Sequence, residues 1–384
     1  MTRTNPSTRP AFGATATAAA ALLLAGPASA ATFTGNGDGT TWEDAGNWNT
    51  AQFPGEAGFP ANQQLDIDGI SNGNRVVNLN SDIGSGYNDF RVDAKSNTGT
   101  TVLNLNAASS VVADGKADTY LSINEGDTNN AAASSTVNLS GDLQVGQLRF
   151  ARDNGTATLN VLDGANLTVT HLGGNGVQMR NDKDLGEAVA ILNVSGGTAT
   201  FGSATAGKFL KMGTVDSRVL ISGNAVFNGI GLTLDTQDAS KVGSTDLIRV
   251  TGSDASITFK AARAWRDDAN TTGSVTFDFV ADAGGVSTVD ILNLLDLDGN
   301  GSTDFAPDLT IDISAYTGSD DLVLFDYGSL DGTFANVTIT GGSGTLDYNY
   351  MGNNQIALTA IPEPASFALL GLGGLVMVTR RRKA

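Results

Sequence analysis

A short phrase, two apolar residues flanking an asparagine, recurs along the middle of the chain and constrains the fold more than any other feature. Each copy is followed by a Ser, Asp or Gly turn and a second short apolar run, as in strands joined by tight turns. The irregular spacing of the copies, roughly 22 to 34 residues, is typical of stacked coils with loops of variable length. Five copies keep the asparagine, at Asn78, Asn104, Asn138, Asn160 and Asn193, and two degenerate copies follow at Val219-Leu220-Ile221 and Ile248-Arg249-Val250.

Residue alternation gives each copy one apolar face and one polar face. In a strand, Leu159 and Val161 share one face, while Thr158 and Asn160 share the other. If such strands stack at about 4.8 Å, the apolar faces form one continuous core. The asparagines then form a column on the outer face, where their side-chain amides make a ladder. The pattern predicts an all-β solenoid, with a series of β-sandwich repeats as the alternative fold.

The first 30 residues have the organisation of a secretory signal peptide. Arg3 and Arg9 supply a positive start, and an Ala-rich apolar stretch follows. Ala28 and Ala30 then provide the small-x-small pattern that signal peptidase requires, so we expect cleavage before Ala31. An uncleaved helical anchor is the alternative.

The other end of the chain carries a second set of targeting features. Pro362-Glu363-Pro364 precedes a short apolar run, and a basic cluster follows it: Arg380, Arg381, Arg382 and Lys383. A run of about fourteen residues spans about 21 Å as a helix, less than the roughly 30 Å of a bilayer core, so it is a marginal transmembrane helix. The basic cluster keeps the tail cytoplasmic and places the rest of the chain outside.

These three features, in this order, closely resemble the PEP-CTERM sorting signal, and Pro362, Glu363 and Pro364 match its motif one for one. The resemblance covers roughly residues 361–384. It implies that an exosortase cuts at or near the motif and releases or re-attaches the protein at the cell envelope. It also implies transient membrane contact through the C-terminal helix before processing. A simple tail anchor is the alternative.

The repeat region, in turn, resembles the right-handed parallel β-helix of autotransporter passenger domains. The segment that precedes it, with Thr41-Trp42 and Gly46-Asn47-Trp48-Asn49, is similar to the opening of such repeats. This implies that Trp42 and Trp48 cap the first coil, with an aromatic sugar-stacking platform as the alternative.

We therefore expect five segments along the chain. They are a signal peptide (1–30), an N-terminal cap (31–70), a β-helix repeat region (71–270), a C-terminal β segment or cap (271–360) and the sorting signal (361–384). The repeat phrase itself is lost near residue 271, although short strand-like runs continue.

One local motif suggests a metal. Loop positions 1, 3, 5, 7 and 9 offer oxygen ligands, the seventh through its backbone, and Gly301 at position 6 allows the sharp turn of a calcium loop. Pro307 stands where a full EF-hand has its last Glu, so an ordinary Asp/Asn/Gly turn is an equal alternative. No cofactor other than calcium is expected. The candidate calcium ligands are Asp296, Asp298, Asn300, Ser302 and Asp304.

Composition narrows the function. The chain has no cysteine and one histidine, His171, which leaves neither a thiol nucleophile nor a histidine metal cluster. Its formal net charge of −18 becomes −24 once residues 1–30 (two Arg) and 365–384 (three Arg, one Lys) are removed. Such acidity disfavours nucleic acid as a partner.

We therefore expect a structural or adhesive protein of the bacterial envelope or its exopolysaccharide (biofilm) matrix, and not an enzyme. Signal peptidase and exosortase are its expected processing partners. Two alternatives remain. One is a secreted β-helix polysaccharide lyase or hydrolase, since paired carboxylates form in space and not in sequence. The other is a calcium-dependent glycan-binding module.

Overall fold

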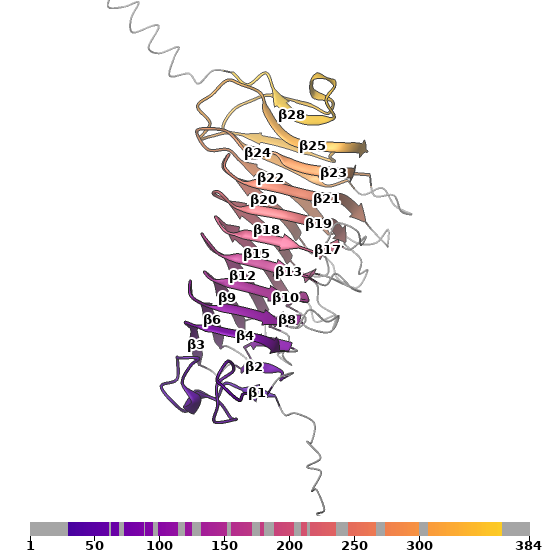
Figure 1. Cartoon of the computed structure of the whole chain (residues 1–384). Coiled ribbons are helices and arrows are strands. Elements are labelled where there is room, and N and C mark those ends of the chain that lie inside the picture. The colour runs from indigo at the N-terminus through magenta and orange to yellow at the C-terminus, as the bar shows by residue number, and fades with distance from the viewer. Residues whose placement is uncertain are drawn as a thin grey trace, which may run out of the picture.

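The computed structural model shows an elongated stack of strands that rises from the N-terminal to the C-terminal end (Figure 1). It describes residues 30–60, 63–68, 73–87, 89–94, 99–113, 120–124, 132–151, 155–170, 177–179, 188–202, 209–212, 216–235, 245–265, 273–298 and 306–362. The signal peptide up to Ser29, His171, Asn300, Ser302 and Asp304 lie outside the described residues, as do Glu363, Pro364 and the basic tail.

One sheet contains ten strands, and every pairing in it is parallel. Each coil contributes one strand, so neighbours in space are three or fewer elements apart in sequence. The strands are, in stacking order, β3 (Asn74–Leu79), β6 (Thr100–Leu105), β9 (Ser134–Leu139), β12 (Gly155–Val161), β15 (Ala188–Ser195), β18 (Asp216–Ser222), β20 (Thr245–Thr251), β22 (Ser274–Val280), β24 (Asp308–Asp312) and β26 (Val337–Thr340).

The second sheet contains eighteen strands, which form two parallel rows in the early coils. The first row is β4 (Asp82–Tyr87), β7 (Ser110–Ala113), β10 (Asp142–Val145), β13 (Asn166–Val169) and β16 (Thr198–Phe201). The second row is β2 (Leu65–Asp68), β5 (Asp89–Asp93), β8 (Tyr120–Ile123), β11 (Gln147–Phe150), β14 (Val177–Met179) and β17 (Phe209–Met212), and β1 (Ala31–Thr32) pairs with β2.

In the later coils, one long strand replaces each pair. The first of these strands pairs with both β16 and β17, and register shifts in the three pairings among the four strands bend the sheet where the earlier coils change rows. The four strands are β19 (Val226–Asp235), β21 (Ser256–Trp265), β23 (Val289–Asp296) and β25 (Leu322–Asp331). An antiparallel hairpin of β27 (Thr345–Asp347) and β28 (Gln355–Thr359) then pairs with β25.

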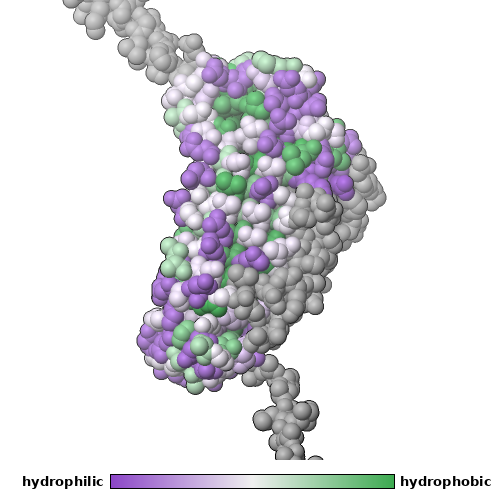
Figure 2. Space-filling model, viewed as in Figure 1, coloured by the Kyte–Doolittle hydropathy of each residue, from purple (hydrophilic) through white to green (hydrophobic). Residues whose placement is uncertain are grey.

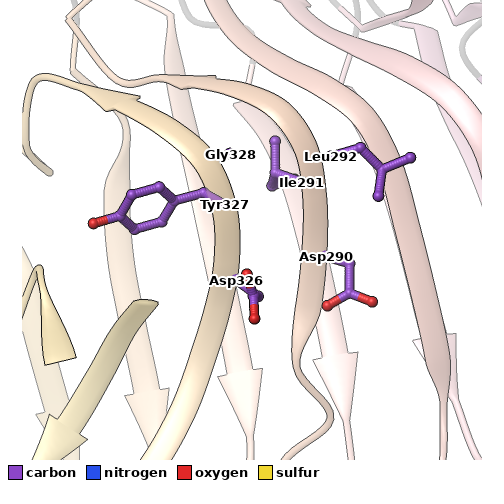
Figure 3. A pocket seen from close by; sticks show the side chains of 6 residues that line it. All are labelled: Asp290, Ile291, Leu292, Asp326, Tyr327 and Gly328. Atoms are coloured by element: carbon purple, nitrogen blue, oxygen red, sulfur yellow. The ribbon is translucent and has the colours of Figure 1, made fainter. Parts of the chain in front are cut away.

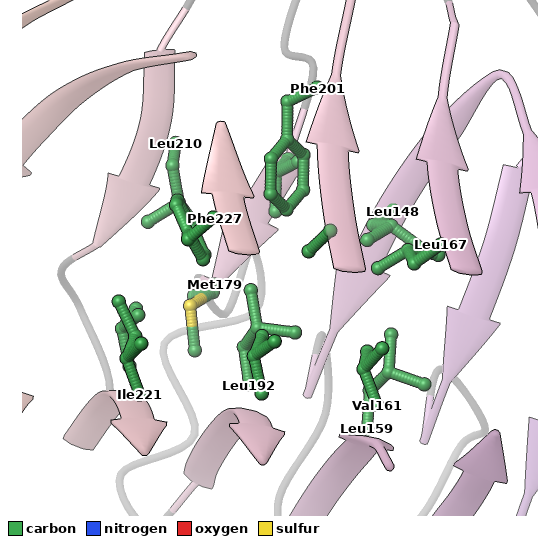
Figure 4. Close-up of a cluster of buried hydrophobic side chains, with 14 of the residues drawn as sticks. Leu148, Leu159, Val161, Leu167, Met179, Leu192, Phe201, Leu210, Ile221 and Phe227 are labelled. Carbon is green, nitrogen blue, oxygen red and sulfur yellow. The ribbon is translucent and has the colours of Figure 1, made fainter. Parts of the chain in front are cut away.

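The core consists of columns of like residues that run through the stack. Leu159 lies between Val137 and Leu192 on the neighbouring strands, and all three are fully buried. In the larger sheet, Phe201 and Phe227 pack against one another with ring centroids 5.0 Å apart, and Figure 4 shows Leu159, Leu192, Phe201 and Phe227 pointing into the interior. The parallel pairing confirms the predicted β-solenoid and excludes sandwich repeats, whose sheets are antiparallel.

Stacking continues beyond residue 270, although the asparagine phrase does not. Phe277, Leu309 and Val337 extend the column that Leu159 belongs to. Apolar residues at alternate positions are sufficient to keep the register, whatever the outward residue between them is. The only helical elements among the described residues are the 3₁₀ turns η1 (Ala45–Asn47) and η2 (Tyr350–Gly352).

Candidate functional site

The predicted asparagine column is present on the outer face of the ten-stranded sheet. In every step, the side-chain Nδ2 of one asparagine donates to the Oδ1 of the asparagine one coil below. Each amide inside the column therefore both donates and accepts, which pins the register of five successive coils. The four bonds are Asn104 to Asn78 (2.8 Å), Asn138 to Asn104 (2.9 Å), Asn160 to Asn138 (2.8 Å) and Asn193 to Asn160 (3.0 Å).

The same column continues with different chemistry in the later coils. Leu220 follows Asn193 and ends the ladder, and Arg249 follows Leu220. The Arg249 Nε then donates to Asp278 Oδ2 at 2.5 Å, and the hydroxyl of Thr310 donates to the other oxygen of that carboxylate. Sequence reasoning identified Leu220 and Arg249 as degenerate repeats but missed this ion pair, because Asp278 lies outside the recognised phrase.

Two tryptophans close the N-terminal end of the stack. Trp42 and Trp48 pack edge to face, with centroids 4.7 Å apart, and Phe33 packs against Trp48 at 5.3 Å. Both indole N–H groups are satisfied within the cap, by the carbonyls of Pro54 and Trp42 (2.9 and 2.8 Å). All three rings are buried, so these residues cap the first coil as predicted, and the sugar-stacking alternative is wrong for both tryptophans.

Polar contacts tie this cap to the first strand of the ten-stranded sheet. The guanidinium of Arg75, which is buried, donates to the carbonyls of Phe33 and Thr34. The backbone of Asn78 accepts from Trp42 N–H (2.9 Å) and donates to the carbonyl of Thr40 (2.8 Å). The cap thus occupies the edge of β3 that would otherwise be open.

A hollow of about 340 Å³ lies beside the bulges of the larger sheet. The strands β23 and β25 place Asp290 and Asp326 side by side across it, as Figure 3 shows. Gly328 is needed there, because a Cβ would lie 2.6 to 2.7 Å from the carbonyl oxygens of Leu292 and Asn293. The lining residues are Asp290, Ile291, Leu292, Asp326, Tyr327 and Gly328.

The two carboxyl groups in this hollow have different surroundings. The side chain of Gln355 donates to Asp326 Oδ2 at 3.1 Å. Partial burial, and next the charge of Asp326, raise the pKa of Asp290 above its usual value. Two neighbouring carboxyl groups, one of them with a raised pKa, are the kind of arrangement from which acid and base pairs are built. Sequence reasoning did not find this pair, because the two residues lie on separate coils.

A second hollow, of about 430 Å³, lies on the same row of strands nearer the N-terminal end. Its lining from β7, β10 and β13 combines hydroxyl and amide groups with one carboxylate and two apolar residues. Asn166 donates to Asp142 at 2.7 Å, and Gln144 and Thr168 stand side by side in the next column. Such groups suit hydrogen bonds with a hydroxylated ligand.

The candidate calcium loop is only partly described. Asp296 ends β23 with its side chain buried, whereas Asp298 is exposed. Within the described ranges, no group of three or more His, Cys, Asp or Glu residues is placed to hold a metal ion. Since the other three ligands lie outside those ranges, the calcium loop stays a prediction.

The described part of the solenoid begins and ends close to the two predicted processing positions. The first strand starts at Ala31, which is fully buried and whose N–H donates to Gln64 at 2.9 Å. At the other end, Ile361 is still part of the core, and Pro362 is exposed. The described strands therefore all lie between the two predicted processing positions.

The comparisons with known proteins bear on this second end. Residues 360–383 match the model of the PEP-CTERM protein-sorting motif. No curated protein and no solved structure matches the chain. In the part of the chain that the structure describes, no helix has the length and apolar character needed to cross a membrane. The match indicates an exported, envelope-associated protein that an exosortase sorts.

Proposed function

We propose that this protein is a structural or adhesive component of the bacterial cell envelope or its exopolysaccharide matrix, and that it has no catalytic activity. The observation that supports this proposal is that all the described strands lie between the two predicted processing positions. Removal of the signal peptide before Ala31 and of the tail after Pro362 would leave every described strand in place. The mature product would be a complete rod.

The surface of the rod suits weak, repeated contact better than catalysis. Hydroxyl and amide groups recur coil after coil, and the hollow at Ser110, Asp142 and Asn166 offers the same chemistry in a shallow depression. Figure 2 shows hydrophilic residues distributed along the visible face instead of gathered in one cleft. Many weak sites on one rigid body give useful avidity for a polymer without a strong single site.

Intact mass and terminal sequencing of the protein from its native host test the processing. We expect a chain that begins at Ala31 and ends between Pro362 and Pro364. Glu363→Ala should leave Arg380 to Lys383 attached, while Glu56→Ala, in the N-terminal cap, should be processed normally. If the wild-type chain keeps its basic tail, the tail is only an anchor, and the matrix role is overturned.

A hydrolase or lyase is the second candidate, and the pair Asp290 and Asp326 favours it. Two carboxyl groups side by side, one of them with a raised pKa, are what a glycosidase needs. Release of reducing or unsaturated sugars from a panel of acidic and neutral glycans, abolished by Asp290→Asn, would establish the enzyme and overturn the structural proposal. If no sugar is released from any glycan in the panel, the hydrolase or lyase candidate is wrong.

The third candidate is a calcium-dependent glycan-binding module. It predicts that calcium raises the melting temperature, and that Asp298→Ala removes this effect. If Asp298→Ala changes neither calcium affinity nor melting temperature, the third candidate is wrong.

A further inference from the structure

The ten-stranded sheet has one covered edge and one open edge. At the covered edge, the N-terminal cap pairs with the backbone of Asn78 in β3. At the other edge, β26 pairs with β24, and no strand of the described residues lies on its far side. The antiparallel hairpin of β27 and β28 extends only the larger sheet.

The hydrogen bonds between β24 and β26 show which backbone groups of β26 do not face β24. Leu309 N–H donates to Asn336 (2.8 Å), and Ile313 N–H donates to Thr340 (3.0 Å). Because alternate residues of a parallel strand face alternate neighbours, the even-numbered residues of β26 face β24. Val337 and Ile339 therefore direct their N–H and C=O groups away from the stack.

The apolar columns of the core also end at this edge. Val337 is the last residue of the column that begins at Val77, and Ile339 ends the column of Leu79. Val77 and Leu79 are 0% exposed under the N-terminal cap, whereas Val337 is 41% exposed. Met351, in the terminal turn η2, is 75% exposed. The C-terminal end thus presents apolar surface together with a strand whose outer edge has no partner among the described strands.

Nothing in the local sequence protects this edge. Natural edge strands are usually shielded by lysine, proline, a bulge or an inward charge. The segment from Asn336 to Gly344 contains no charged residue and no proline, and β26 pairs with β24 without a bulge.

We propose that β26 is a dimerisation edge, which pairs in antiparallel fashion with β26 of a second copy of this chain about a twofold axis. A head-to-tail stack is excluded, because the cap already occupies the edge of β3 that the next molecule would need. A twofold contact requires only the open edge and closes on itself.

The antiparallel pattern fixes the register of this contact. Val337 lies opposite Ile339 of the second copy, and Thr338 lies on the axis, so that the outward groups exchange about four backbone hydrogen bonds. The strand is short, and the interface is smaller than the roughly 1,200 to 2,000 Å² of a stable complex. The dimer therefore dissociates on dilution. Because each copy is strongly acidic, added salt screens the repulsion and strengthens the contact.

The dimer would be a rod of twice the length, with a tryptophan cap at each far end. Pro362, the last described residue of the sorting signal, follows β26 by 22 residues along the chain. Release by exosortase would then free this end for pairing. That link rests on the proposed processing, whereas the dimer itself does not.

Sedimentation velocity tests the dimer on the processed chain, residues 31–364, which includes the complete solenoid with both terminal segments. We expect a dimer whose fraction rises with protein concentration and with salt. Val337→Lys should weaken it by roughly tenfold or more, because two lysines then meet near the axis. Val76→Lys is the matched control, since Val76 is 40% exposed on β3, and it should leave the dimer unchanged.

A second variant separates pairing from folding. Val337→Pro removes one outward N–H and leaves the bonds to β24 in place, so it should also weaken the dimer at an unchanged melting temperature. A wild-type chain that stays monomeric at all concentrations and salt levels overturns the proposal. So does a dimer that survives both Val337 variants. Failure of sorting in the host would overturn only the proposed function, because the processed chain is tested directly.

Discussion

The two ends of this solenoid are closed by different means. At the N-terminal end, Trp42, Trp48 and Phe33 cover the core, and Arg75 and Asn78 bind the cap to the first strand. At the C-terminal end, a reversal of chain direction in β28 ends the larger sheet, while the smaller sheet simply stops at β26. One end is sealed by packing, and the other is only half closed.

This difference shows what a parallel stack needs at its limits. Each interior coil covers the core of the coil before it, so only the first and last coils expose apolar columns and free backbone groups. Large aromatic rings can cover the apolar columns of the core, and backbone pairing can occupy the free edge of the terminal strand. An end of the stack is fully covered only when both are present. The N-terminal end has both, whereas at the C-terminal end only the larger sheet is extended, by an antiparallel hairpin.

The largest effect should come from opening the sealed end. Trp42→Ala removes a fully buried ring that contacts Trp48 and Phe90, and we expect a loss of about 3 to 5 kcal/mol in the free energy of unfolding. Urea denaturation followed by far-UV circular dichroism measures it. Met351→Ala, at the half-closed end, should change stability by less than about 0.5 kcal/mol. Equal losses from the two variants would remove the contrast between the ends.

The next effect concerns the polar bonds that hold each terminal segment. Arg75→Met deletes a buried guanidinium that donates to two cap carbonyls, and should cost about 2 to 3 kcal/mol. Arg75→Lys should restore only part of this, because a single ammonium group replaces a planar fork. Gln355→Met, which loses one neutral donor to Asp326, should cost about 1 kcal/mol. A larger loss of stability at Gln355 than at Arg75 would mean that polar bonds hold the C-terminal segment more strongly than the N-terminal cap, the reverse of what we propose.

The sequence predicted the features that depend on local alternation. Asn160 lies between Leu159 and Val161, and a period of two leaves no choice about which of them faces outward. The same reasoning, repeated in five copies, predicted the ladder. A resemblance to the opening of such repeats implied that Trp42 and Trp48 form a cap, and their burial confirms that role.

Features that depend on distant pairing were not predictable in this way. Asp290 meets Asp326, and Arg249 meets Asp278, only because loops of unequal length keep the coils in register. The open edge at Val337 is harder still to predict, because it depends on whether a later strand pairs with β26, and none of the described strands does. A single sequence shows that β26 alternates, but not whether another strand covers it.

The ladder offers a smaller test, within the body of the rod. Asn160→Ala removes one donor and one acceptor, so we expect a loss of about 1 to 2 kcal/mol, while Thr158→Ala on the same face should be near neutral. Leu220→Asn should extend the ladder from Asn193 toward the half-closed end, with a gain of about 0.5 kcal/mol. Thermal unfolding of the three variants measures these changes in stability. If Leu220→Asn is destabilising, the ladder does not propagate by register alone.

Low pH should destabilise both ends of the solenoid, and the N-terminal end more than the C-terminal end. Hydrogen bonds from the Thr41 hydroxyl and N–H, then from Thr40 N–H and the Asn47 amide, hold the pKa of Asp38 well below its usual value. Near β26, the hydroxyl and N–H of Ser314, and then Thr340, lower the pKa of Asp312 against a smaller opposing effect of burial.

Both pKa values are lower in the folded chain than in the unfolded one, so each carboxylate contributes stability above about pH 4 that is lost as the pH falls. Melting temperatures between pH 2.5 and pH 7 should therefore drop on the acid side. Asp38→Asn should flatten that drop more than Asp312→Asn does, because more hydrogen bonds in the cap require the ionised form. An identical acid profile for wild type and Asp38→Asn would mean that the cap opens independently of its carboxylate, and that packing of Trp42 and Trp48 alone seals this end.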